Sequence, residues 1–237
     1  GNDGEVNGAT LTTDRHGKSN NAYGFDGVAT ISTPQNNFQK GDNPRTVSIW
    51  FLAPEQQTHT PISVLWGAGK ENINGKTTAI QIFRSSGISI DTWGNPIAIK
   101  LPNAINNSRW NNFIWSYSEG VSKSYLNGSL VEEKERVIDT EYDFSVIGGN
   151  SYNNRERFTG KIDAVRIYKR ALSAEEAKGF SDGKVVGAFD MAREQQKTTP
   201  PDQAAAPEAE ESLEGLTEEE LYIKKLEKYA MKIATGQ

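Results

Sequence analysis

Short runs of alternating apolar and polar residues fill most of the chain as far as residue 168. In Arg45–Leu52, Val47, Ile49 and Phe51 alternate with their neighbours, which predicts a strand with one buried face. Asn127-Gly128 is typical of a two-residue hairpin turn. The runs that predict strands are Ala9–Leu11, Ala22–Ser32 (a strand pair around Asp26-Gly27), Arg45–Leu52, Pro61–Gly67, Thr77–Arg84, Gly87–Trp93, Pro96–Leu101, Trp110–Tyr117, Ser124–Leu126, Ser129–Val131, Tyr142–Ile147 and Phe158–Tyr168. This spacing favours an all-β, antiparallel β-sandwich within residues 1–190.

The last of these runs is denser in apolar residues than the others. Lys161–Tyr168 therefore predicts a strand that is covered on both faces. Ser173 followed by Glu176 three residues later is a capping box, which predicts that a short helix begins there. Leu172 and Ala177 are placed to pack against each other across this helix start.

The pattern changes after residue 190. Residues 191–215 are polar and rich in Pro and Ala, which predicts an extended linker. Residues 216–236 predict an amphipathic helix, with Thr217 and Glu220 as a capping box and Gly236 at its end. An isolated helix of this length is marginally stable in water, so its apolar stripe is expected to dock on this domain, a neighbouring domain or a partner. That stripe contains Tyr222, Leu226, Tyr229 and Ile233.

Composition narrows the classes of protein that fit. The 237-residue chain carries a formal net charge of −5, which gives no electrostatic reason to expect a nucleic-acid partner. It has no Cys, which excludes disulfides, thiolate metal sites and a Cys nucleophile. No apolar run reaches the roughly 20 residues that a membrane span needs, and the first residues lack the pattern of a signal peptide.

Four segments resemble one known family. They are Asp14–Ser32, Arg45–Pro54, Arg109–Val131 and Gly160–Glu176. Together they are similar to bacterial laminin G-like domains of the concanavalin A-like lectin/glucanase superfamily. The resemblance implies a jelly-roll sandwich that binds rather than catalyses, located outside the cell, on its surface or in the periplasm. It also implies a further strand ahead of Gly1, without which a sheet edge would be open.

Catalysis is considered because the superfamily includes glucanases, which place paired carboxylates at alternate positions of one strand. No segment here has that arrangement. The nearest acidic cluster contains Glu132, Glu133, Glu135, Asp139 and Glu141. It is mixed with basic residues, which is typical of a solvated edge. We expect the chain not to be an enzyme.

Calcium is one of two explanations for a pair of carboxylates. Asp26 and Asp163 match positions where the family pattern carries acidic residues, and the resemblance implies a structural Ca²⁺ there. A carboxylate within a strand as apolar as Ile162–Tyr168 must be paired, hydrogen-bonded or metal-bound. The other explanation for Asp163 is a pairing with Arg166, Lys161 or backbone amides.

Sugar binding requires an exposed aromatic ring and nearby polar groups. Trp50, Trp110 and Trp115 lie in strand patterns or at a strand entry, where core packing is expected. Two aromatics in turn or loop contexts are better placed, and polar residues surround the second of them. The predicted carbohydrate-binding residues are Trp93, Asn150, Tyr152, Asn153 and Arg155.

Two hypotheses follow from this pattern. The first is a non-catalytic, secreted or cell-surface module that recognises carbohydrate or a protein surface within a larger assembly. The alternative is a structural or assembly subunit without a glycan ligand. That subunit would use an open sheet edge and the C-terminal helix for its contacts.

Overall fold

The computed structural model describes one region of the chain in detail, with short gaps. The described residues are 4–33, 38–54, 62–70, 73, 75–83, 87–92, 97–99, 105, 107, 109–141, 144–150 and 156–183. The chain divides into two compact units, Gly1–Gly187 and Ala188–Gln237. All described residues belong to the first unit. The predicted linker 191–215 and helix 216–236, with the docking residues Tyr222, Leu226, Tyr229 and Ile233, lie outside them.

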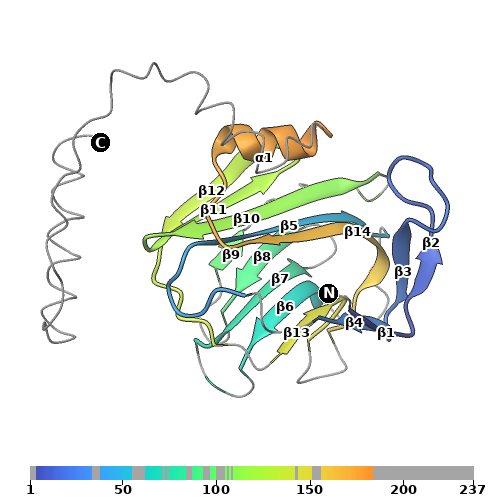
Figure 1. Cartoon of the computed structure of the whole chain (residues 1–237), viewed down its shortest axis with the longest axis horizontal. Coiled ribbons are helices and arrows are strands. Elements are labelled where there is room, and N and C mark those ends of the chain that lie inside the picture. The colour runs from blue at the N-terminus through green and yellow to red at the C-terminus, as the bar shows by residue number, and fades with distance from the viewer. Residues whose placement is uncertain are drawn as a thin grey trace, which may run out of the picture. The chain divides into compact units, whose positions relative to one another are not determined.

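The described residues form two antiparallel sheets that face each other (Figure 1). The first, here named the β6 sheet, has the order β1-β4-β13-β6-β7-β8-β9, and the second, the β5 sheet, has the order β12-β11-β10-β5-β14-β3-β2. The strands are β1 Glu5–Asn7, β2 Thr10–Thr12, β3 Ala22–Asp26, β4 Thr30–Ser32, β5 Arg45–Leu52, β6 Ile62–Gly69, β7 Thr77–Phe83, β8 Gly87–Asp91, β9 Ile97–Ile99, β10 Asn111–Ser118, β11 Val121–Leu126, β12 Ser129–Glu135, β13 Phe144–Ile147 and β14 Thr159–Tyr168. The predicted antiparallel β-sandwich is confirmed.

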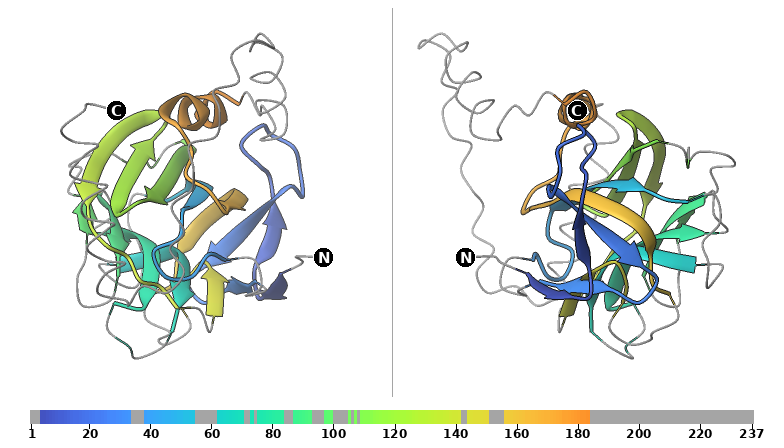
Figure 2. Two further views of the ribbon diagram at one scale, coloured as in Figure 1. Left: turned by 60° about the vertical axis from the view of Figure 1, so that its left-hand side comes forward. Right: turned by 90° about the vertical axis from the view of Figure 1, so that its right-hand side faces the viewer.

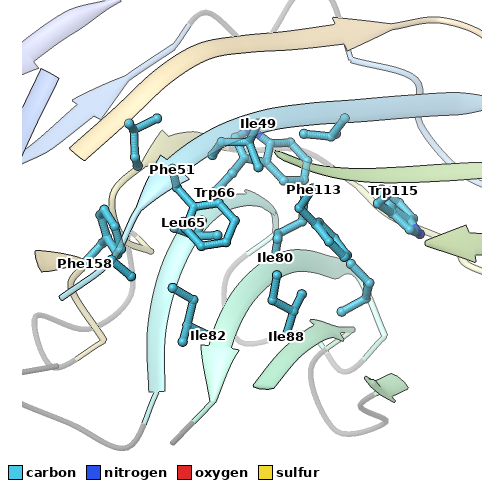
Figure 3. Packing of buried hydrophobic residues seen from close by; sticks show 14 of the residues in the cluster. Ile49, Phe51, Leu65, Trp66, Ile80, Ile82, Ile88, Phe113, Trp115 and Phe158 are labelled. Carbon is cyan, nitrogen blue, oxygen red and sulfur yellow. The ribbon is translucent and has the colours of Figure 1, made fainter. Parts of the chain in front are cut away.

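The core lies between the two sheets (Figure 3). Its largest fully buried side chains include Trp66 and Leu65 from the β6 sheet and Phe51, Phe113 and Trp115 from the β5 sheet. Because side chains alternate along a strand, each sheet presents one apolar face to the other. The prediction that Trp115 belongs to the core is confirmed. Trp50 is different, because it lies half-buried on the opposite face of β5 from Ile49 and Phe51.

The turn at Asp26 sends the chain from one sheet to the other. The Oδ1 atom of Asp26 accepts hydrogen bonds from the backbone N–H groups of Val28 and Ala29, both at 2.9 Å. The sequence pattern predicted a strand pair around this turn, and that prediction is wrong. β3 pairs with β2 and β14 in the β5 sheet, whereas β4 pairs with β1 and β13 in the β6 sheet (Figure 2).

A short helix, α1 (Ala174–Ser181), follows β14 and is the described helix of the chain. The Ser173 side chain accepts from Glu176 N–H, and the Glu176 carboxylate accepts from Ser173 N–H, so the predicted capping box is confirmed. Leu172, Ala177 and Phe180 pack on the outer face of the β5 sheet (Figure 1). Within the described part of the chain, no helix is both long and apolar enough to span a membrane.

β14 is less covered than its sequence predicted. The strand was expected to be buried on both faces, but only Ile162 and Asp163 are buried and the other eight positions are half-buried. A β-bulge interrupts its pairing with β5 between Asp163 and Arg166. Ala164 adopts the left-handed region there, with φ of +48°, where a Cβ is unfavourable. The prediction failed because residue type alone does not decide how many neighbours a strand acquires.

Candidate binding sites

The loop between β13 and β14 is tied together at its base. Gly148 N–H donates to the Leu65 carbonyl at 2.9 Å, and Phe158 N–H donates to the Gly148 carbonyl at 3.0 Å. Val64 N–H donates to the Glu156 carbonyl at 3.0 Å. These bonds attach both ends of the loop to the edge of β6, so its origin on the sheet is fixed.

Side chains reinforce this base. The Asn150 Nδ2 atom donates to Glu156 Oε2 at 2.6 Å, and Asn150 is only 1% exposed. The Arg157 side chain packs against Gly149, where a Cβ atom would collide with it, and burial lowers the pKa of Arg157. Asn150, predicted to contact sugar, is therefore held inside the base of the loop. Tyr152, Asn153 and Arg155 lie outside the described residues, between these two anchored ends.

The strands that precede the two parts of the predicted carbohydrate site run in opposite directions. β13 runs toward the Ile62 end of β6, and the loop that contains Asn150 leaves at that end. β8 runs in the other direction and finishes at Asp91, toward the Gly69 end. Trp93 itself lies outside the described residues, but the strand that precedes it leads away from the Asn150 loop.

A compact loop between β2 and β3 places the Arg15 side chain over the β5 sheet. The Asp14 carboxylate accepts from His16 N–H at 2.8 Å, from Lys18 N–H at 2.9 Å and from Asn21 Nδ2 at 2.7 Å. These bonds, with that of Asn21 the largest contribution, lower the pKa of Asp14. Asp14 thus organises the loop around itself, and the next residue, Arg15, reaches the sheet.

Arg15 is the partner that Asp163 requires. Its Nη1 atom forms an ion pair with Asp163 Oδ2, and its guanidinium carbon lies 5.0 Å from the centre of the Trp50 ring. Asp163 and Trp50 are paired residues of neighbouring strands, so one cation covers both. The predicted partners of Asp163 were Arg166, Lys161 or backbone amides. Arg15 is 148 residues away in the sequence, and no local pattern could indicate it.

The two predicted calcium ligands do not lie together. Asp26 is exposed and pairs in register with Thr159, whereas Asp163 lies four positions further along β14. That separation is roughly 13 Å along a strand, far beyond the reach of one ion. Asp163 already has Arg15, and within the described residues no three His, Asp or Glu side chains gather to hold a metal. The pair does not fit one shared ion, and calcium binding stays a prediction.

Asp26 lines a shallow hollow that the sequence pattern did not indicate. The hollow has a volume of about 480 Å³ and lies over the start of β14, where Lys161 and Thr159 border it. Leu52 and Pro54 supply its apolar wall. The turn at Asp26, which takes the chain from one sheet to the other, therefore also places the Asp26 carboxylate in the wall of this hollow.

The acidic cluster identified in the sequence is divided between β12, which carries Glu132, Glu133 and Glu135, and the segment after it, where Asp139 and Glu141 lie beside lysines. Lys76 Nζ lies 2.5 Å from Asp139 Oδ2 and 3.1 Å from Glu141 Oε1, and Lys70 Nζ lies 3.3 Å from Glu141 Oε2. The hydrogen bond with Asp139, followed by that with Glu141, raises the pKa of Lys76. Lys76, then Lys70, lowers the pKa of Glu141. Asp139 and Glu141 are thus ion-pair partners of lysines, whereas burial raises the pKa of Glu132 on β12.

The two antiparallel sheets define the class of protein, a two-sheet β-sandwich. The chain belongs to the family described as Concanavalin A-like lectin/glucanases superfamily, whose laminin G-type model matches residues 25–178. The resemblance seen in the sequence is thereby confirmed. The comparison with curated protein sequences gave no match.

Solved structures with this fold are distant in sequence. Domain 4 of AbnA, a GH43 extracellular arabinanase from Geobacillus stearothermophilus in complex with arabinotriose, is 20% identical with a TM-score of 0.58, over 75% of this chain and 87% of that one. A Ruminococcus gnavus IT-sialidase CBM40 bound to alpha2,3 sialyllactose is 16% identical with a TM-score of 0.50, over 59% and 82%.

A toxin domain shows the same fold. The binding domain of Paraclostridial Mosquitocidal Protein 1 is 17% identical with a TM-score of 0.60, over 77% of this chain. The match spans about half of that longer chain, at 47%. At these identities the likeness concerns the fold. The neighbours are carbohydrate-binding or receptor-binding domains.

Proposed function

We propose that this protein is a non-catalytic module that binds carbohydrate through the loop between β13 and β14. The observation that carries the proposal is the double tie at the base of this loop, by backbone bonds at Gly148 and Phe158 and by the Asn150–Glu156 hydrogen bond. A fixed base reduces the entropy that ordering a loop around a ligand would cost. Tyr152, Asn153 and Arg155, between the ties, supply the ring, amide and cation that recognise a sugar.

The fold neighbours support this reading. Two of them are described with bound oligosaccharides, arabinotriose and sialyllactose. The proposal includes a position outside the cell, at its surface or in the periplasm, because one neighbour belongs to an extracellular arabinanase. The neutralised carboxylates at Lys76 support a role in binding rather than in hydrolysis.

A glycan array with the full chain tests this function, followed by titration of the retained glycan against two variants. We expect Tyr152→Ala to weaken binding at least about tenfold, because ring stacking supplies much of the affinity of such sites. Trp93→Ala is the matched control, since β8 leads away from the loop. It should leave affinity unchanged.

Three results would count against this function. Unchanged binding by Tyr152→Ala with an intact thermal melt would remove the loop as the site. Release of reducing sugar from the retained glycan would show an enzyme. An array without any bound glycan, together with stable oligomers in light scattering, would favour the assembly role.

A further inference from the structure

Within the described residues, the second half of β14 lacks a partner strand on one side. β14 pairs with β3 only through Thr159–Ile162, while Arg166–Tyr168 pair with β5 alone. Ala164 and Val165 lie in the β-bulge between Asp163 and Arg166 and have no register partner in either strand. Residues 164–168 would span at most about 17 Å if fully extended. β3 begins at Ala22, so no residue of this strand lies opposite them.

A cavity lies between the sheets beside this edge. Its volume is about 490 Å³, and its apolar walls include Val165 and Ile167 from β14, Tyr23 from β3, and Ile31 and Trp66 from the β6 sheet. An apolar cavity of about 150 Å³ holds one benzene-sized group, so this one would hold about three. Figure 2 (right) shows the strands that border it, β14, β3, β4 and β1.

Two further observations show that side chains around the cavity are incompletely packed. Val165 and Ile167 are aliphatic and pack partly against the core, yet both stay half-buried. Trp66 is 1% exposed, and its indole N–H has no acceptor within the described residues. Burying a donor without a partner is costly, so this N–H marks a part of the core that is incompletely packed.

The charge around the edge selects the partner. Arg166 is on the outer face of β14, with its guanidinium carbon 5.9 Å from the Phe180 ring centre, and the exposed Lys169 follows the strand. The only carboxylate of β14, Asp163, is already paired with Arg15. The outer side of the gap is therefore positive, while its inner side is apolar.

We propose that residues 164–168 accept an extended segment of a partner polypeptide as an additional strand of the β5 sheet. Its apolar residues enter the cavity at alternate positions, and acidic residues between them face Arg166 and Lys169. Main-chain hydrogen bonds supply affinity in strand addition, and alternate side-chain pockets supply specificity. Neither of the two proposals depends on the other.

Hydrogen exchange of the full chain provides the test, with a synthetic peptide of about seven alternating valine and glutamate residues as the probe. A peptide of the same composition, with its valines in one block, is the control. We expect the alternating peptide to slow exchange within residues 164–168 at least about tenfold and the block peptide to leave it unchanged. Ile167→Asp should weaken binding about tenfold or more, because it places a charge in the cavity. Val137→Asp, at a side chain that is 68% exposed, should not change binding.

Hydrogen exchange of the wild-type chain tests the strand addition even if Ile167→Asp does not fold. Slow exchange of residues 164–168 in the free monomer would overturn the proposal, because the chain's own residues would then cover the edge. Slow exchange that appears only in a self-associated form would make a second copy the occupant and would also overturn it. Equal effects of the two peptides would show nonspecific adsorption instead of strand addition.

Discussion

β5 and β14 are neighbours in one sheet, and their burial is the reverse of what their sequences predicted. β5 reads as a strand with one buried face, yet six of its eight residues are buried. β14 reads as a strand covered on both faces, yet it is half-buried along most of its length. The two strands pair along Lys161–Asp163 and again along Arg166–Tyr168, on either side of the β-bulge, so the difference does not lie in their position along the sheet axis.

The difference comes from what covers the outer face of each strand. Thr46 Oγ1 donates to the Arg170 carbonyl at 2.8 Å and accepts from Leu172 N–H at 3.1 Å. Thr46 is therefore buried beneath the segment that leads into α1, with the hydrogen bonds of its hydroxyl satisfied. β14 leads into that segment, but within the described residues it has no strand on the side opposite β5 beyond Ile162. How deeply a residue of β5 or β14 is buried therefore depends on which segment the chain places over it, as well as on its hydrophobicity.

The largest expected effect is a core truncation in β5. Phe51→Ala should reduce the free energy of unfolding by about 3–5 kcal/mol, because Phe51 is fully buried between the sheets. Ile167→Ala in β14 should cost only about 1–2 kcal/mol, because its side chain still contacts solvent. Urea unfolding of both variants measures the contrast. Equal losses would mean that β14 is covered in solution as fully as β5.

A smaller loss of stability than that of Phe51→Ala is expected when the contacts at the start of α1 are removed. Arg170 holds Glu176 through two hydrogen bonds, at 2.7 and 2.5 Å, and this guanidinium contact is the main cause that lowers the pKa of Glu176. Glu176→Gln should cost about 1–2 kcal/mol at neutral pH, and β5 amides should exchange faster as its cover loosens. The matched control is Glu175→Gln, an exposed neighbour that should change stability less.

The pH dependence of this pair has a definite sign. Because the folded state lowers the pKa of Glu176, its stabilisation is fully present above the ordinary glutamate pKa of about 4.3. It is lost as the pH falls through the lowered, folded-state value. The stability difference between wild type and Glu176→Gln should therefore shrink on acidification. A difference that grows at low pH would contradict the role of the Arg170 contact.

The smallest expected effect concerns calcium. Asp163 lies where the burial of β14 ends, and Arg15 already balances its charge. The difference between thermal midpoints measured with calcium and with a chelator should be the same in wild type and in Asp163→Asn, because only a ligand that binds the folded state raises the midpoint and Asp163 already has a partner. A higher midpoint with calcium in the wild type, but not in Asp163→Asn, would make this carboxylate a calcium ligand.

Local signals in the sequence were reliable. Asn127-Gly128 predicted the turn between β11 and β12, and Ser173 with Glu176 predicted the start of α1. These features depend on the conformations and hydrogen bonds of a few adjacent residues. Strand existence was predictable for the same reason, since alternation is a local property of the chain.

Partners that are distant in the sequence were not predictable. The alternation in Ala22–Ser32 does not reveal that β3 and β4 enter different sheets. Likewise, nothing near Asp163 indicates that Arg15 is its counter-ion. The carbohydrate residues were grouped by type, and only the sheet register shows that β8 leads away from the Asn150 loop.

The pairing of β3 with β14 also determines when this fold can form. Phe25 pairs with Gly160, so one of the first strands to be synthesised joins nearly the last strand of the sandwich. Contacts between residues so far apart in sequence require closure of a long loop and make folding slow. On the ribosome, β3 must wait with its apolar face exposed until β14 has emerged. During that interval the nascent chain would depend on chaperones or on its own acidic character to avoid aggregation.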